Sequence, residues 1–467
     1  MDTGYAAWML TAASLVLLMT PGLAFFYGGM NRPKSVLNMM MMSFGALGVV
    51  TVVYVLWGWS MSFGPKDLGG VFANPFSLFG LTGIDPMSYV FVAFQLTFAV
   101  ITAALISGAV ADRVKFSTWM VFVPIWVTLS YFPLAHMVWG GGFLSGANAG
   151  GLAAKLFGFV DGAAKVIPQD YAGGTVVHIN AGMAGLVLAL LVGVRRGFGK
   201  EVMRPHNIPF TMLGAGLLWF GWFGFNVGSI VPTATQGVAG RSGAFFDNSV
   251  QFATNFVGET GMVWVNTCVA TAAAMLGWLL VEKLRDGHAT SLGAASGVVA
   301  GLVAITPACG SLSPVGSIIL GLVAGGLCAL AVGLKYRFGY DDSLDVVGVH
   351  LVGGLVGTIL IGFLATAEAP AGVDGLFYGG GADQLWRQII GALAVLVFSF
   401  VLTYVIGTII QKTIGFRITE EEEVTGIDTV EHAESAYDFA SLGSSGSTAP
   451  LAGQARAEAR STEGVGA

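Results

Sequence analysis

The chain of 467 residues has very little charge. Asp, Glu, Lys and Arg make up 10% of it and apolar residues 55%, whereas an average soluble domain is about a quarter charged. So few charged side chains could not cover the surface of a water-soluble enzyme of this length, and so apolar a chain is not intrinsically disordered. The net charge of −6 includes no basic cluster of the kind that binds nucleic acid. The composition predicts a membrane protein with many spans.

Cysteine is also scarce. Cys268, Cys309 and Cys328 are odd in number, lack a CxxC spacing and lie in or beside apolar runs, so we interpret them as packing residues. The sequence contains no HExxH motif and no Walker A motif, which argues against a zinc hydrolase and an ATP-driven pump. We therefore expect neither an enzyme nor a metal or cofactor.

Long apolar runs are what the chain has in abundance. A helix needs about 20 apolar residues to cross a bilayer, and backbone groups in lipid must be satisfied within the segment. By this measure the sequence predicts an all-α polytopic membrane protein with eleven transmembrane helices, at about residues 5–30, 36–63, 89–111, 117–139, 174–195, 207–229, 255–281, 289–308, 313–334, 345–366 and 386–411.

The loops between these runs differ in positive charge. Sixteen Lys and Arg residues fall on the side that includes the C-terminal tail, and five fall on the other side, at Lys66, Lys155, Lys165, Arg241 and Arg387. Because cytoplasmic loops carry the excess of Lys and Arg, we predict a cytoplasmic C-terminus and an N-terminus outside, in a multi-pass protein of the cell membrane.

Two segments repeat the pattern Val-His-x3-Gly-x2-Gly. The first covers residues 177–185 with His178, and the second covers residues 349–357 with His350. They lie in the fifth and tenth runs, so the two copies cross the membrane in opposite directions. This indicates an inverted repeat of five plus five helices with the last helix left over, an arrangement that places a substrate path between the halves. Because ionisable groups in a membrane usually mark function, we expect the two imidazoles to share that path.

Hydropathy places both histidines near the ends of their runs. For the rings to meet, we expect the tenth span to extend back toward Asp341 and the fifth toward Asp170. Asp170 lies eight residues before His178, where it can cap the helix by accepting backbone N–H groups. A direct role as a cation ligand stays open as the alternative.

Several motifs, in the order of the chain, resemble those of the ammonium transporter family (Amt/MEP/Rh), in its bacterial Amt form. They are HMVWGGG (136–142), DYAGGTVVHIN (170–180), WFGFNVGS (222–229), TPACG (306–310) and DVVGVH (345–350), and the resemblance spans residues 5–437. It implies a homotrimer in the lipid bilayer, with one path through each subunit, that transports ammonium and methylammonium.

The resemblance also implies a role for individual residues. Ammonium would be recruited outside by Trp139, Ser229 and Phe98, with Asp170 in a supporting role. Phe98 and Phe225 would form a gate, and Trp222, His178 and His350 would line the pore. Ammonium suits aromatic faces and a hydroxyl acceptor, and losing its proton at the gate costs less than carrying a bare charge through an apolar lumen. The sequence departs from the family pattern in two places. The first is the long stretch from 140 to 169, which could cover or reshape the outer vestibule.

The second departure concerns the tail, which resembles the regulatory segment of the family through Gly426, Asp428, His432 and Tyr437. Ile427 and Ala433 replace the more usual Leu and Gly, which leaves a tight turn at Ala433 open. The resemblance implies a possible PII-type signalling partner. From composition alone, the run 420–423 of four glutamates is typical of a solvated face.

The sequence therefore predicts a transport domain at 1–411, a cytoplasmic regulatory tail at 412–440 and a disordered segment at 441–467. The expected function is transport of ammonium or ammonia across the cell membrane. Two alternatives stay open: an ammonium sensor that signals through the tail, and a membrane enzyme with a metal at the histidine pair, although no third ligand is evident.

Overall fold

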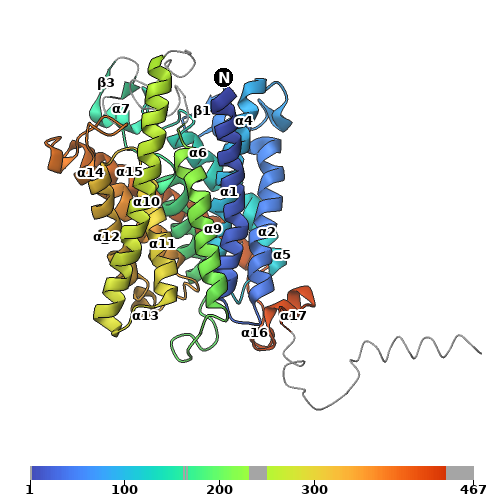
Figure 1. Cartoon of the computed structure of the whole chain (residues 1–467). Coiled ribbons are helices and arrows are strands. Elements are labelled where there is room, and N and C mark those ends of the chain that lie inside the picture. Colours follow the sequence, from blue (N-terminus) through green and yellow to red (C-terminus); the bar gives the residue numbers. More distant parts are fainter. Residues whose placement is uncertain (1–2, 161–162, 165–166, 231–249, 438–467) are drawn as a thin grey trace, which may run out of the picture.

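The computed structural model describes residues 3–160, 163–164, 167–230 and 250–437. Lys165, Arg241 and the predicted disordered segment 441–467 lie outside these residues. The molecule is a bundle of long helices with a short loop layer at each end (Figure 1). We call the end at which α1 begins the N-terminal face, and the opposite end, which carries α16 and α17, the tail face.

Most of the bundle consists of uninterrupted apolar helices. These are α1 (Thr3–Met30), α2 (Val36–Val53), α4 (Tyr89–Ile106), α5 (Phe116–Trp126), α8 (Asn180–Val192), α9 (Ile208–Val227), α10 (Val250–Asp286), α11 (Ser291–Ile305), α12 (Pro314–Ala331), α14 (Val352–Leu364) and α15 (Asp383–Thr413). Within the described part of the chain, four spans contain a π-helical stretch, at η1 (Tyr54–Gly58), η5 (Val127–Tyr131), η6 (Gly174–Ile179) and η7 (Val347–Leu351). Asn207, Thr290 and Ser313 begin α9, α11 and α12 as side-chain N-caps.

The all-α membrane architecture predicted from the sequence is confirmed. Within the described residues, ten helical stretches are long and apolar enough to cross a bilayer. The eighth predicted span corresponds to α11, which is apolar but has 15 residues. α15 ends at Thr413, slightly beyond the boundary that the sequence predicts for the transport domain.

The two halves of the repeat interlock at the histidine segments. The α1 helix packs along α9, so the first span of each half contacts its counterpart. The η6 segment contacts α14 of the other half, and η7 contacts α8. Each histidine segment therefore packs against the helix that follows the histidine segment of the other half.

The last helix, α15, lies outside the repeat but contacts both halves. Its Gln388 is fully buried and donates from Nε2 to the carbonyl oxygens of Gln169 (2.9 Å) and of Thr358 on α14 (3.0 Å). Ser399 donates to the carbonyl oxygen of Asn180 on α8 (2.9 Å). The helix thus ties the start of the fifth span to the tenth.

The two faces carry different small elements. On the N-terminal face lie α3 (Trp59–Phe63), the hairpin of β1 (Asp67–Leu68) and β2 (Phe72–Ala73), the short helices η2 (Phe79–Leu81), η3 (Pro86–Ser88) and η8 (Leu376–Tyr378), α6 (Phe132–Val138), α7 (Leu152–Phe157), and the hairpin of β3 (Phe159–Val160) and β4 (Ala163–Ala164). On the tail side lie η4 (Ser107–Val110), α13 (Leu334–Phe338), α16 (Glu420–Thr425) and α17 (Ile427–His432).

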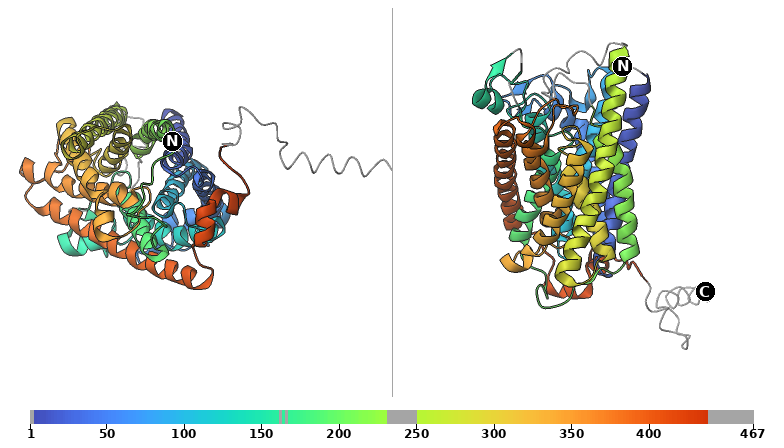
Figure 2. Two further views of the ribbon diagram at one scale, coloured as in Figure 1. Left: turned by 90° about the horizontal axis from the view of Figure 1, so that it is seen from below. Right: turned by 60° about the vertical axis from the view of Figure 1, so that its left-hand side comes forward.

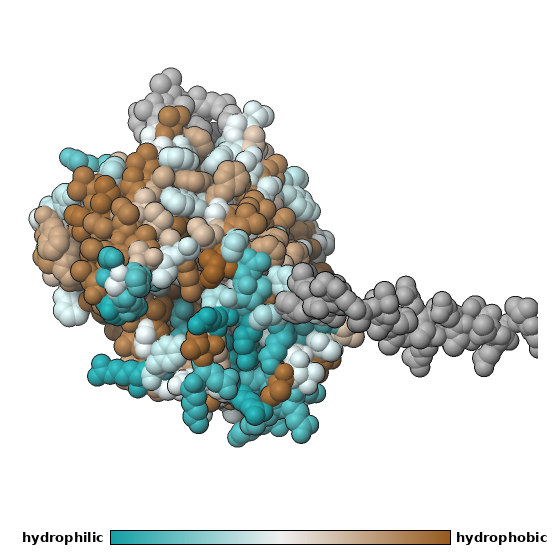
Figure 3. All heavy atoms as spheres, turned by 60° about the horizontal axis from the view of Figure 1, so that its bottom comes forward, coloured by the Kyte–Doolittle hydropathy of each residue, from teal (hydrophilic) through white to brown (hydrophobic). Residues whose placement is uncertain are grey.

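Seen from the tail face, α16 and α17 lie beside the start of α2 (Figure 2). With this face turned forward, hydrophilic residues gather in the lower half of the view, and hydrophobic residues lie mainly above them (Figure 3).

Candidate functional site

The two histidines of the repeat meet inside the bundle. The Nδ1 atoms of His178 and His350 are 3.3 Å apart, and their rings stack with centroids 5.4 Å apart. Both side chains are buried, and each lies in the π-helical first turns of its helix. The contact between the imidazoles that the sequence predicts is therefore present in the structure.

The expected extension of the two helices is wrong. The fifth span begins at Gly174 and the tenth at Val347, so neither reaches back to Asp170 or Asp341. Instead the chain approaches each helix in a non-helical conformation: Gly173 has φ +116° and Asp345 has φ +64°. The rings meet because the helices begin inside the protein, a placement that a count of apolar residues does not contain.

Asp170 makes this helix start possible. Its carboxylate accepts backbone N–H groups of Gly173 (2.9 Å), Gly174 (2.6 Å), Thr175 (3.0 Å) and Val176 (3.2 Å), and also the Thr175 hydroxyl. Burial raises the pKa of Asp170, while the hydrogen bonds from Thr175 and the backbone act in the opposite direction. Because both oxygens are used by donors of its own helix, the geometry favours the helix cap over the cation ligand.

A second cap was missed by the sequence analysis. Asp342 lies eight residues before His350, the same spacing as Asp170 to His178. It accepts the N–H groups of Val346 (3.0 Å) and Val347 (2.7 Å). Burial, followed by the nearby Asp345, raises the pKa of Asp342 to about 7. The repeated Asp-x7-His spacing was the signal that would have identified it.

An aromatic file leads from the N-terminal face to the histidines. The Trp139 ring meets Phe98 edge-on with centroids 6.1 Å apart, and Phe98 stacks on Phe225 at 4.0 Å and 14°. Phe225 lies 6.2 Å from the His178 ring. Trp139 also donates from Nε1 to the carbonyl oxygen of Asp170 (3.1 Å). The structure thus brings the aromatic residues of the predicted outer site, the predicted gate and the histidine pair into one continuous set of contacts.

Two hydroxyl groups complete this set. The Ser229 hydroxyl donates to the carbonyl oxygen of Phe225 (2.8 Å), which leaves lone pairs of its oxygen available to accept. Trp222 stacks on His178 with ring centroids 5.4 Å apart, and its Nε1 donates to the Thr306 hydroxyl (2.8 Å). Thr306 lies in a motif that the sequence analysis quoted, but its role in orienting Trp222 was not predicted.

An apolar cavity adjoins the histidine pair. It is lined by Met19, Leu23, Ile101, Leu105, Val177, His178, Leu218, Trp222, Phe225, Val299 and His350. The indole N–H of Trp222 is already used by Thr306, so the side-chain polar atoms left to a guest are imidazole nitrogens. The Nε2 atom of His178 is buried without a hydrogen-bond partner among the described residues.

The described residues of the long stretch 140–169 lie on the N-terminal face, where α7 and β3 are (Figure 1). Its end is fixed by Gln388, whose Oε1 accepts the N–H of Gln169 (2.6 Å) and whose Nε2 donates to the carbonyl oxygen of that residue (2.9 Å). Arg387 lies over the Phe157 ring, with its guanidinium carbon 4.9 Å from the centroid. The stretch is therefore tied to α15 immediately before Asp170.

The predicted tail residues lie on the tail face, away from the pore. Asp428 accepts the N–H groups of Leu37 (2.9 Å) and Asn38 (2.8 Å) at the start of α2. His432 Nε2 lies 3.0 Å from the Asn38 side-chain oxygen, and Tyr437 shares a hydrogen bond of 2.8 Å with His206.

The tail also makes the turns that its motif requires. Gly426 has φ +117° and packs against Lys34. Ala433 has φ +54° and ends α17 in the left-handed conformation, so the turn forms without glycine.

Glu423 shows that the acidic run is not uniformly solvated. Its side chain is buried, whereas Glu420 and Glu421 are exposed. Its carboxylate pairs with Arg417 (2.9 Å) and Arg32 (3.5 Å) and accepts the backbone N–H of Arg196 (2.9 Å). The expectation of a solvated face was wrong for this residue, because composition does not show which glutamate of a helix faces the protein.

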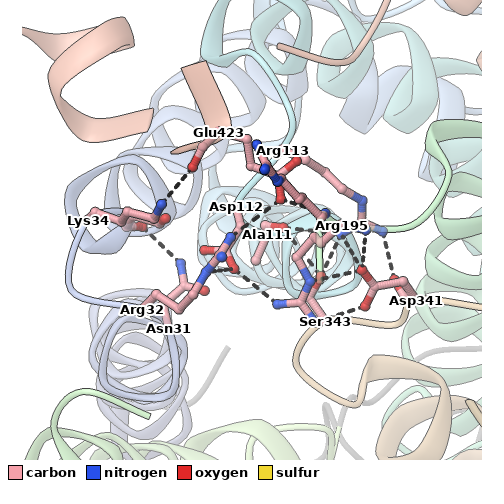
Figure 4. A network of polar contacts seen from close by, with 12 residues as sticks. Asn31, Arg32, Lys34, Ala111, Asp112, Arg113, Arg195, Asp341, Ser343 and Glu423 are labelled. Atoms are coloured by element: carbon pink, nitrogen blue, oxygen red, sulfur yellow. Dashed lines mark hydrogen bonds and ion pairs between the residues drawn. The ribbon is translucent and has the colours of Figure 1, made fainter. Parts of the chain in front are cut away.

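A largely buried ionic network continues from Glu423 to Asp341 (Figure 4). Arg32 pairs with Asp112 (2.9 Å), and Arg195 pairs with both Asp112 (3.0 Å) and Asp341 (2.8 Å). Burial would raise the pKa of Asp341, but hydrogen bonding with Arg195 and the charges of Arg113 and Arg195 lower it overall. Asp341 therefore anchors the segment before the tenth span and is not part of that helix.

The chain also resembles known proteins along nearly its whole length. A family model described as the Ammonium Transporter Family matches residues 7–437. A protein of Mycobacterium tuberculosis called "Ammonium transporter" is 53% identical over 468 residues, which cover 94% of this chain and 91% of that protein. One of Bacillus subtilis with the same name is 42% identical and covers 94% and 99%.

Among solved structures, one titled "Sensor Amt Protein" matches with a TM-score of 0.77 at 27% identity, over 92% of this chain and 98% of that one. Mep2 of Candida albicans matches with a TM-score of 0.74 at 30% identity, over 90% and 88%.

Proposed function

Because this chain belongs to the ammonium transporter family, whose named relatives are transporters and not enzymes, we propose that it moves ammonium across a membrane by separating the proton from the nitrogen. The observation that carries the proposal is the unbroken file from Trp139 through the stacked Phe98 and Phe225 to the histidine pair. It ends at a cavity with apolar walls.

Recruitment takes place at the N-terminal face, above the stacked rings. Trp139 and Phe98 offer aromatic faces, and each cation–π contact is worth about 0.5–2 kcal/mol. The Ser229 oxygen accepts one of the four N–H groups of ammonium, because its own hydrogen is directed at Phe225. Binding of this strength is weak enough for the ion to move on. Asp170 supports the site by holding the helix start beside Trp139.

The two stacked rings act as a gate for charge. A spacing of 4.0 Å between their centroids leaves no passage for a hydrated ion in this conformation. Removing the proton from ammonium at neutral pH costs roughly 3 kcal/mol, since its pKa lies about two units above seven. Placing the bare cation in an apolar cavity costs far more. Ammonia therefore crosses without its charge, and potassium, which has no proton to lose, is rejected.

The histidine pair then provides the polar atoms of an otherwise apolar path. With one hydrogen between the two Nδ1 atoms, the Nε2 atom of His178 remains available to a passing molecule. Imidazoles exchange protons near neutral pH, so the pair can relay a hydrogen bond or a proton. Trp222 keeps the His178 ring in place by stacking.

The proposal also covers the orientation in the membrane, the oligomeric state and the role of the tail. The protein is a multi-pass membrane protein. We propose that it forms a homotrimer in the cell membrane, with the N-terminal face outside and the tail face in the cytoplasm. The transport domain would cover 1–411. The tail at 412–440 would regulate it, with Gly426, Asp428, His432 and Tyr437 at the contacts described above and a PII-type protein as the partner. Methylammonium would serve as a second substrate.

Replacing His178 or His350 with Ala tests the proposal. We expect the rate of methylammonium uptake into proteoliposomes, or its discrimination against potassium, to change at least about tenfold in one variant, because the lumen loses its polar atoms. A matched control is Leu218→Ala, which enlarges the same cavity but keeps the imidazoles. Unchanged rate and selectivity in both histidine variants would contradict the proposal. The current that follows an ammonium pulse on a supported membrane shows whether the proton crosses as well.

A sensor is the second candidate, because the tail docks through Glu423 on the loops that contain Arg32 and Arg196, and one structural relative is titled a sensor. Flux through the purified full-length protein separates the two. A transporter gives saturable uptake into protein-containing vesicles, whereas a sensor binds ammonium with uptake equal to that of empty vesicles.

A further inference from the structure

A histidine outside the pore occupies an unusual position on the N-terminal face. His136 lies in the last turn of α6, three residues before Trp139, and is only 2% exposed. Its Nδ1 lies 3.0 Å from the carbonyl oxygen of Ser62 at the end of α3. Its Nε2 lies 2.9 Å from the carboxylate of Asp67 in β1. One ring therefore joins three segments that are distant in the sequence.

Both partners of this ring are hydrogen-bond acceptors. A neutral imidazole has one N–H, and only the protonated ring has two. The two contacts can therefore form together only when the ring is charged, and the neutral ring must present a lone pair to one of the two oxygens. Asp67 is the charged group in contact with the ring. Gly140 and Gly142, which also pack against it, contribute backbone, and Lys66 is exposed.

The same contacts build a collar around the predicted recruitment site. The Asp67 carboxylate also accepts the N–H of Gly70 (2.9 Å), and the carbonyl of Gly70 accepts the N–H of Phe143 (2.6 Å). The carbonyl of His136 itself accepts the N–H groups of Gly140 (3.0 Å) and Gly142 (2.9 Å). The hairpin 67–73 and the loop 140–151 are thus fastened to the end of the helix that presents Trp139.

We infer that His136 is a positioning residue of the outer site, which in its charged form locks the collar through Asp67 and so holds Trp139 against Phe98. This inference rests on the proposed function. The half-exposed side chain of Asp67 gives protons of the N-terminal face access to the lock. The lock is complete when the ring carries both hydrogens, and it loses one of its two contacts when the ring carries only one.

The test compares Asp67→Asn with the wild type in the full-length protein. The substitution keeps an oxygen for one hydrogen bond but removes the charge that retains the second proton on His136. Hydrogen exchange of residues 64–78 and 140–151 is followed from about pH 5 to 8, the range in which imidazoles titrate. We expect the variant to exchange faster than the wild type at the acidic end and the difference to disappear at the alkaline end.

Methylammonium uptake supplies the second measurement. The half-saturating concentration of the methylammonium cation should be about threefold to tenfold higher in Asp67→Asn at acidic pH, with the maximal rate retained, and should converge with the wild type at alkaline pH. His136→Gln should show the same loss of pH dependence. Asp85→Asn is the matched control, because it removes a charge from the same face and leaves the contacts of His136 intact.

A difference in exchange that is constant with pH, or an equal effect of Asp85→Asn, would overturn the inference. Exchange reports on the lock even if no uptake is observed, so failure of the lock and failure of the proposed transport function are distinguishable.

Discussion

The two Asp-x7-His segments have the same design in different surroundings. In both, a carboxylate caps a π-helical start and a histidine follows in the first turns. Asp170 is held by uncharged donors and lies beside Trp139 of the aromatic file. Asp342 lies between Asp345 and an ionic network that extends to the tail. The repeat thus contains the capped helix start that presents a histidine twice. In the proposed function the N-terminal face receives the cation, whereas the tail docks on the opposite face.

The largest expected effect distinguishes the two caps. Asp170→Asn replaces an acceptor that serves four backbone N–H groups with an amide that carries donors of its own, and each buried donor left unpaired costs about 1–3 kcal/mol. We expect a loss of thermal stability in detergent and a fall in uptake of at least about tenfold. Asp342→Asn is the counterpart and serves only two N–H groups, so its effect on stability should be roughly half. Equal effects would show that the caps are interchangeable.

Much of the two Asp-x7-His segments and of the site around them could be predicted from the sequence, and the features that were not predicted have physical reasons. The Val-His-x3-Gly-x2-Gly repeat gave both histidines and their opposite directions, because helical spacing is a local property. The aromatic file followed from motifs, since no single phenylalanine among thirty-two is distinguishable by composition. The helix starts that hydropathy predicts, at 174 and 345, agree with Gly174 and Val347. The expected extension toward Asp170 and Asp341 was wrong because hydropathy does not show how deep inside a protein a capped helix begins. Glu423 was missed because burial on a short tail helix depends on distant loops.

The second prediction tests the specialisation of the tail face. Glu423→Gln removes the charge that pairs with Arg417 and Arg32. Loss of one partner from a buried pair costs about 3–5 kcal/mol, but the partial exposure of both arginines reduces this to about 1–2 kcal/mol. We expect residues 417–437 to become sensitive to protease while the bundle stays folded.

Glu421→Gln, in the same helix but exposed, is the control and should leave the tail protected. If Glu423→Gln also leaves the tail protected, the carboxylate is not its anchor.

The smallest expected effect is a pH dependence of the folding stability, which should be strong only for the cap formed by Asp342. The folded protein raises the pKa of Asp342 to about 7, so between the unfolded value of about 4 and 7 the folded state binds the extra proton. Stability therefore falls as the pH rises through this range and levels off above it.

The measurement is the melting temperature of Asp342→Asn relative to the wild type at about pH 5 and about pH 8. The melting temperature of the variant should rise relative to that of the wild type toward pH 8. A difference that is independent of pH would contradict the raised pKa of Asp342.

The crossing position of α15 has a consequence for the transport cycle. Gln388 of this helix donates hydrogen bonds to the backbone before the fifth span and to the carbonyl oxygen of Thr358 in the tenth span. Ser399 donates to the carbonyl oxygen of Asn180 in the fifth span. Two halves stitched together in this way cannot rock as rigid bodies without breaking buried hydrogen bonds. For the proposed transport function, we therefore expect turnover to be set by small rotations of aromatic side chains within a nearly static scaffold, with the kinetics of a narrow channel and not those of an alternating-access transporter.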